Sequence, residues 1–94
     1  MARAKAQILV GACTPYTCKI SKKASLVFRQ ATEGIYGVRY EPVAVSQQIV
    51  SGTNYKFFCN ARVAVQYPLN QAAIVSIYQP LSGKAHITNI QHIN

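Results

Sequence analysis

The sequence predicts a single α+β domain in which one amphipathic helix packs on a four-stranded antiparallel sheet. Apolar residues recur at a spacing of three and four in one stretch, residues 20–37. Beyond Gly37 apolar and polar residues alternate, and turn signals divide the chain into strand-length segments. With 94 residues the chain can form one modest core but not two. We therefore expect one domain over residues 1–94, with residues 1–19 as an N-terminal segment.

The helix is expected over residues 20–37, "ISKKASLVFRQATEGIYG". The residues of its buried stripe are Ala24, Val27, Phe28, Ala31 and Ile35. Ser21 is the expected N-cap, and the two glycines near the end of the stretch offer stopping points. Lys22 and Lys23 in the first turn oppose the helix dipole. They are expected either to be tolerated in solvent or to help hold an anion.

Strands are expected throughout the remainder of the chain, residues 38–94. The segments are, in order, 38–50, 55–67, 71–79 and 85–93. In the second segment one face is expected to hold Tyr55, Phe57, Cys59, Ala61, Val63, Val65 and Tyr67, with Phe58 and Ala64 as apolar exceptions on the other. Pro42 suggests a bulge or an edge position in the first segment. The sequences "YPLN" at 67–70 and "PLSGK" at 80–84 predict a loop and a tight turn.

The net charge of +8 raises the question of an anionic partner, because ten basic residues face two acids. The densest basic group is Lys19, Lys22 and Lys23. It lacks the interleaved aromatic residues that stack on bases in single-strand binders. The sequence therefore favours a general attraction to anionic surfaces over specific nucleic-acid binding.

No apolar run approaches the roughly 18 to 20 residues that cross a bilayer, so a soluble protein without a membrane partner is expected. The start of the chain has basic residues followed by apolar ones, as in a signal peptide. Its apolar part is about six residues, below the roughly 7 to 15 of a signal core. This favours a cytoplasmic protein over an exported one, unless the chain is already mature.

The three cysteines, Cys13, Cys18 and Cys59, cannot all pair within one chain. Cys13 and Cys18 would close a small loop in an oxidising compartment, and three free thiols are the expectation in a reducing one. No pair has the spacing of a zinc knuckle. Cys59 lies on the apolar face of its strand and is expected to be a packed core thiol.

No active site is expected. The carboxylates, Glu33 and Glu41, are too few and too separate in the chain for paired acid and base catalysis. His86 and His92 are expected to share one face of the last strand with their α-carbons roughly 20 Å apart, too far to hold one metal. The glycines are isolated, so no phosphate-binding loop is present. The sequence therefore predicts neither an enzyme, nor a cofactor, nor a metal site.

The apolar residues of one hairpin tip are the best functional candidate. In "QQIVSGTNYKF", residues 47–57, Ile49 and Val50 run directly into Ser51 and Gly52, where a hairpin facing water normally has polar residues. Either these side chains fold back onto the core around a glycine with positive φ, or they form a wedge that enters a partner's cleft.

The stretch Gln48-Ile49-Val50-Ser51-Gly52 resembles the Gln-x-Val-x-Gly signature of the cystatins, inhibitors of papain-like cysteine proteases. The following Thr53-Asn54-Tyr55 is similar to the residues that commonly continue the signature in the stefin branch of the family. Residues 37–61 are similar to small bacterial cystatin-like proteins. Leu9-Val10-Gly11 resembles the N-terminal segment of the family, and Pro80-Leu81 falls where many cystatins carry Pro-Trp. The resemblance covers roughly residues 9–93. The chain departs from it in a short stretch before the helix and in lacking Trp.

The resemblance implies a cystatin-like fold and a reversible inhibitor that blocks a papain-like cysteine protease. The residues implied to contact the protease are Leu9, Val10, Gly11, Gln48, Ile49, Val50, Ser51, Gly52, Pro80 and Leu81. It also implies either a monomer or a dimer that exchanges the helix and its adjoining strand. Two alternatives are a protein-binding module of the same fold without inhibition and a basic nucleic-acid-binding protein.

Overall fold

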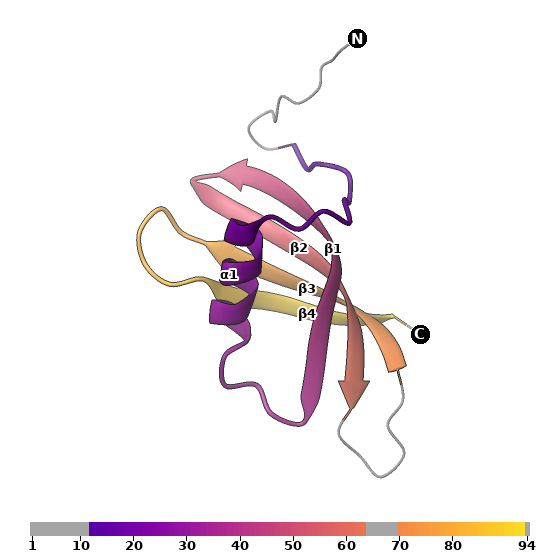
Figure 1. Ribbon diagram of the computed structural model, residues 1–94. Coiled ribbons are helices and arrows are strands. Elements are labelled where there is room, and N and C mark those ends of the chain that lie inside the picture. Colours follow the sequence, from indigo (N-terminus) through magenta and orange to yellow (C-terminus); the bar gives the residue numbers. More distant parts are fainter. Residues whose placement is uncertain (1–11, 64–69, 94) are drawn as a thin grey trace.

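The computed structural model describes residues 12–63 and 70–93, and it contains one helix packed on an antiparallel sheet (Figure 1). The elements are α1 (Lys22–Thr32), β1 (Val38–Val50), β2 (Gly52–Val63), β3 (Asn70–Gln79) and β4 (His86–Ile93). The four strands lie in the order β1-β2-β3-β4, each antiparallel to its neighbour. This confirms the α+β class predicted from the sequence, and the arrangement is consistent with a cystatin-like fold.

The helix is shorter than the expected 20–37. Ser21 is the N-cap, as predicted, and its side-chain oxygen accepts a hydrogen bond of 3.1 Å from the backbone N–H of Ala24. The helix ends at Thr32 because Glu33 leaves the helical conformation with ψ of 130° and Gly34 follows with φ of +91°. In the described part of the chain, no helix is long and apolar enough to cross a membrane.

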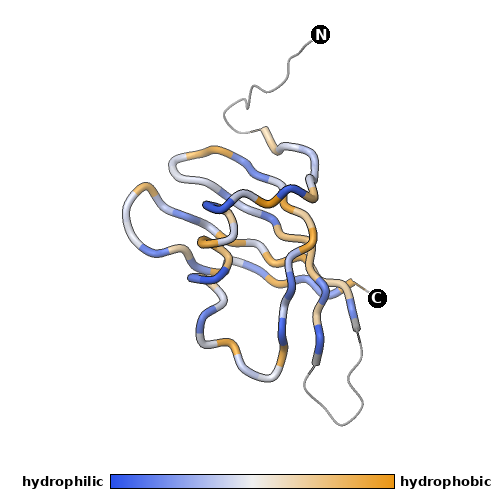
Figure 2. The backbone as a smooth tube through the Cα atoms, viewed as in Figure 1, coloured by the Kyte–Doolittle hydropathy of each residue, from blue (hydrophilic) through white to orange (hydrophobic). Residues whose placement is uncertain are grey.

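The core lies between α1 and one face of the sheet, where the hydrophobic segments of β2 and β3 run beneath the helix (Figure 2). The ring of Phe28 meets that of Phe57 edge-to-face, with centroids 4.9 Å apart, and Phe57 stacks at 5.8 Å on Tyr55. The other buried members of this cluster are Ala24, Val27, Val45, Cys59, Val75, Ile77 and Ala85. Three residues of the predicted stripe, Ala24, Val27 and Phe28, are thus buried on the sheet, and Ala31 packs against them partly buried. Ile35 lies beyond the end of the helix, so its place in the stripe was predicted wrongly.

The alternation predicted for the second strand is confirmed over the described residues. Tyr55, Phe57, Cys59 and Ala61 are buried, and Phe58 between them is 36% exposed on the other face. The strand begins at Gly52, earlier than expected, because pairing with β1 continues to the turn. The remainder of the predicted segment, residues 64–67, and most of the predicted loop at 67–70 lie outside the described residues.

β1 forms one edge of the sheet, and its pairing register with β2 shifts between Pro42 and Ala44, as the proline predicted. The residues before α1 run along its outer side but pair with it at two isolated bridges, Cys13 with Gln48 and Thr17 with Val45. This short stretch covers part of the exposed edge without forming a complete strand.

The two histidines do not share a face, so that prediction is wrong. The β3–β4 register passes from Ile77 opposite Ile87 to Ser76 opposite Asn89, which leaves one extra residue, Thr88, in β4. Such a bulge reverses the alternation of side chains beyond it. The ring of His92 accordingly lies 6.1 Å from that of Tyr40 on the helix side, and the ring of His86 lies 5.7 Å from that of Tyr78 on the other face.

Candidate functional site

The β1–β2 turn and the β3–β4 turn meet at one end of the sheet (Figure 1). We call residues 48–52 the first tip and residues 80–84 the second tip. Together they border a surface hollow of about 340 Å³. Its lining residues are Lys23, Ile49, Val50, Gly52, Thr53, Gln79, Pro80 and Leu81. The structure therefore brings together the apolar residues of both predicted contact loops.

Two of these apolar side chains are open to solvent. Leu81 is 82% exposed and Val50 is 36% exposed. Ile49 and Pro80 are half-buried beside them. The sequence left open whether the apolar side chains of the first tip fold back onto the core. Val50 does not, and Ile49 does so only in part. The exposed apolar surface at this end is available to a partner.

Gly52 is enclosed by the protein itself. Its φ is +104°, and a Cβ atom added to it would lie 2.5 Å from the backbone oxygen of Gln79 and 2.8 Å from the hydroxyl oxygen of Tyr78. The same hydroxyl donates a hydrogen bond to the backbone oxygen of Ser51. The glycine of the signature is thus required by the shape of the first tip, independently of any partner.

The second tip is fixed by one side chain. The amide nitrogen of Gln79 donates hydrogen bonds of 3.0 Å to the backbone oxygens of Pro80 and Gly83. Gly83 has φ of +113°, which a glycine adopts without strain. Sequence reasoning missed the positioning roles of Tyr78 and Gln79. The available signal was a glutamine immediately before a predicted turn, since its amide can donate to backbone oxygens of the turn.

The N-terminal contact residues of the prediction, Leu9, Val10 and Gly11, lie outside the described residues. The chain that follows them is held beside the first tip, where the backbone N–H of Thr14 donates to the backbone oxygen of Gln47 at 2.8 Å. Cys13 pairs with Gln48 one step closer to the turn.

Gln48 and Ser51 do not line the hollow between the tips. The side-chain oxygen of Gln48 accepts a hydrogen bond of 3.2 Å from the amide of Asn54, across the β1–β2 pair. Ser51 is exposed at the turn. The predicted contact residues are therefore divided between the hollow and its surroundings.

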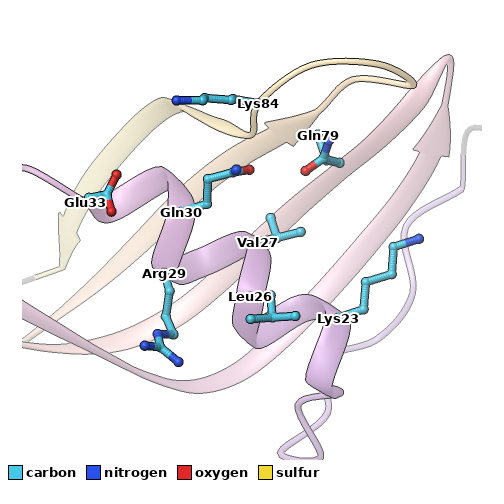
Figure 3. Close-up of a pocket in the computed structure, with 8 residues that line it drawn as sticks. All are labelled: Lys23, Leu26, Val27, Arg29, Gln30, Glu33, Gln79 and Lys84. Carbon is cyan, nitrogen blue, oxygen red and sulfur yellow. The ribbon is translucent and has the colours of Figure 1, made fainter.

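A second hollow of about 560 Å³ adjoins the first, because Lys23 and Gln79 line both. Figure 3 shows it between α1 and the β3–β4 turn, with Arg29 pointing to the other side of the helix. The side-chain oxygen of Gln30 accepts a hydrogen bond of 3.0 Å from the backbone N–H of Ala85 there. With one carboxylate, Glu33, and no histidine or cysteine among its lining residues, this hollow has no acid–base or nucleophilic pair.

All three cysteines are free thiols, two of them exposed and Cys59 buried. Burial raises the pKa of Cys59 from 9.0 to about 12, which keeps the thiol protonated and unreactive at neutral pH. This is the core thiol that the sequence predicted. Among residues 12–63 and 70–93, no group of three or more His, Cys, Asp or Glu side chains is placed to hold a metal ion.

Comparisons of this chain with family models, with curated proteins and with solved structures found no match. The functional interpretation therefore depends on the geometry of the two tips and on the resemblance of residues 48–52 to the signature quoted above.

We predict that the three thiols differ in reactivity and that burial of Cys59 makes the folding stability depend on pH. At pH 8 an alkylating reagent should modify Cys13 and Cys18 rapidly and Cys59 only after unfolding. Because the pKa of Cys59 is higher in the folded state, stability is retained below about pH 9 and declines as pH rises from there towards 12. Burial also raises the pKa of Tyr55, which acts in the same direction. Mass spectrometry of the alkylated protein checks the reactivity, and rapid modification of Cys59 would contradict it.

We predict that alanine is tolerated far less at Gly52 than at Gly34. Both glycines have positive φ, so each substitution introduces backbone strain of about 1–3 kcal/mol. Gly34 has no neighbouring atom within 4 Å, whereas Gly52 faces the oxygen of Gln79 at 2.5 Å. Gly52→Ala should therefore lower the free energy of unfolding more than Gly34→Ala in urea titrations. Equal losses would mean that the first tip can move away from Gln79.

Proposed function

We propose that this protein is a reversible inhibitor of papain-like cysteine proteases that occludes the active-site cleft with its two hairpin tips. The observation that carries the proposal is the shared hollow, which puts Val50 of the first tip and Leu81 of the second on the same end of the sheet. A wedge needs this arrangement, because a cleft is filled by adjacent apolar groups and not by separate ones.

The energetic contribution of the tips is expected to come from apolar burial. Leu81 is 82% exposed, and full burial of a leucine side chain contributes about 1.5–3 kcal/mol. Val50 adds a smaller term, since it is 36% exposed before binding. These are the residues we expect to act as anchors in the hydrophobic part of a cleft.

The tips are preorganised, which supports a binding role. Tyr78 is hydrogen-bonded to the backbone of the first tip, and Gln79 is hydrogen-bonded to the backbone of the second. Both side chains come from the end of β3, so one strand fixes the two loops relative to each other. A surface held in this way loses little conformational entropy on binding.

The inhibition proposed requires no chemistry from this protein. The apolar tips exclude substrate and water from the cleft, and the protease nucleophile meets side chains and loop backbone in place of a scissile bond. The N-terminal residues Leu9, Val10 and Gly11 are the third contact in the proposal. They lie outside the described residues, and the chain that follows them is hydrogen-bonded to β1 at Thr14.

We predict that the parent protein slows hydrolysis of a small fluorogenic peptide by papain at micromolar concentration or below. Val50→Asp should weaken the inhibition constant by about tenfold or more, because a charge replaces an apolar anchor. The matched control is Tyr36→Asp. Tyr36 is 90% exposed on the connection between α1 and β1, at the other end of the sheet (Figure 1), and its replacement should leave inhibition unchanged.

Two outcomes would contradict the proposal: no inhibition by a folded parent protein, or the same inhibition by both variants. In the first case the alternative is a protein-binding module of this fold with a different partner. Circular dichroism of each variant confirms that the fold is retained.

We also predict that Leu81→Trp strengthens inhibition by about tenfold. The resemblance places a tryptophan at this position in many cystatins, and an aromatic anchor buries more area than leucine. At 82% exposure the position can hold the larger ring without displacing a neighbour. Leu26→Trp is the matched control, since Leu26 is 60% exposed on α1 and outside the hollow between the tips. Equal effects of the two substitutions would exclude a specific contact by the second tip.

A further inference from the structure

The face of the sheet that α1 leaves uncovered, which we call the open face, carries a distinctive row of side chains along β2. Because Phe57 packs against the helix, residues of the opposite alternation point away from it. The row comprises Asn54, Lys56, Phe58, Asn60 and Arg62. The last four side chains are exposed. On this central strand the ring of Phe58 therefore lies between Lys56 on one side and Asn60 and Arg62 on the other.

Phe58 has little cover from its neighbours across the strands. Its partner on β1 is Ala44, which has a small side chain, and its partner on β3 is the half-buried Ile74. Phe58 therefore keeps 36% of its surface exposed in the middle of the sheet. The apolar face of an exposed phenylalanine is a platform on which another planar ring can stack.

The charged residues that flank this ring along β2 are both cations. At about 3.3 Å per residue, the α-carbon of Lys56 is roughly 7 Å from that of Phe58 along β2, and that of Arg62 is roughly 13 Å away on the other side. Arg62 lies directly opposite Arg39 of β1, which adds a third cation to this part of the open face. The open face has one carboxylate, Glu41, opposite Asn60.

We propose that the open face binds single-stranded nucleic acid, with a base stacked on Phe58 and phosphates at Lys56 and Arg62. An exposed aromatic ring flanked by cations is the combination that single-strand binders use. A second copy of this protein is a poorer occupant, because both chains carry a net charge of +8. A duplex is also disfavoured, since its stacked bases offer no free face to Phe58. This inference is independent of the proposed inhibition.

The alternation in the sequence predicted Phe58 on the outer face of its strand, but it did not identify a binding surface there. Lys56, Phe58 and Arg62 are too dispersed along the chain to form a basic run, and the densest lysine cluster lies elsewhere, around the start of α1. Strand geometry collects the three residues on one face. The exposed amides of Asn60, two residues further along β2, and of Gln91 on β4 lie on the same face as the ring and are available to base edges, so the binding is expected to tolerate many sequences.

The test is fluorescence anisotropy of a labelled 15-nucleotide oligo(dT) titrated with the full chain at 50 and 200 mM salt. The parent is expected to bind, more weakly at the higher salt. Phe58→Ala should weaken binding by about fivefold or more, and Phe58→Leu, which keeps apolar bulk for folding, should weaken it as well. Lys56→Gln should weaken binding and reduce the salt dependence by about 0.7 in log–log slope, the value of one phosphate contact on a single strand.

The controls remove equivalent groups from other surfaces. Lys22→Gln makes the same change of charge on α1, and Tyr36→Ala removes an aromatic ring that is 90% exposed away from the open face. Both should bind nearly as well as the parent. The proposal is overturned if the parent does not bind at 50 mM salt, if a duplex of equal length binds as tightly, or if Lys22→Gln and Lys56→Gln have the same effect. A dimer in light scattering that Phe58→Leu dissociates would overturn it too, by identifying the open face as a self-association surface.

Discussion

The edge-to-face contact between Phe28 of α1 and Phe57 of β2 is the constraint on which the rest of the structure depends. It fixes the helix over the centre of the sheet with ring centroids 4.9 Å apart. Because side chains alternate along a strand, burying Phe57 also determines that Phe58 faces outward. A slip of one residue would bury Lys56 and expose Phe57, which costs both the desolvation of a charge and the loss of an aromatic contact. The contact thus sets the core and the composition of the open face together.

The ends of the sheet follow from a second, smaller set of interactions. Tyr78 and Gln79 are consecutive residues at the end of β3. Tyr78 donates a hydrogen bond to the backbone of the first tip, and Gln79 donates to the backbone of the second. Gly52 packs against the same two residues. The two tips therefore form one unit held by β3, and a change in either loop is transmitted to the other through Gln79. This coupling explains why a glycine can be essential to the first tip without touching a partner.

Much of the fold could be predicted because it is encoded locally. The alternation through β2 and the effect of Pro42 each depend on residues close in sequence. The errors have a different origin. The helix was extended past Thr32 because Ile35 continues the apolar spacing, whereas Glu33 and Gly34 end the helix.

The prediction that the two histidines share a face was wrong because the bulge at Thr88 depends on pairing with β3, which no local sequence pattern indicates. The candidate site was predictable in the same way only in part. The signature identified the first tip, but the hydrogen bond from Tyr78 to Ser51 connects residues far apart in the sequence and required the structure. The bonds of Gln79 to Pro80 and Gly83 are local.

Both proposed surfaces arise where the chain departs from the pattern that folding alone requires. A sheet with one face open to solvent is stable with polar residues on that face and at its turns. Here Phe58 lies in the centre of the open face and Leu81 lies within the β3–β4 turn. Neither side chain contributes to the core beneath α1, so core packing does not account for them. Leu81 and Phe58 lie on different parts of the molecule, one at the edge beside Lys23 and the other on the open face beside Lys56. Substitutions at one surface should therefore leave the other intact, and the two functions can be separated in a single protein.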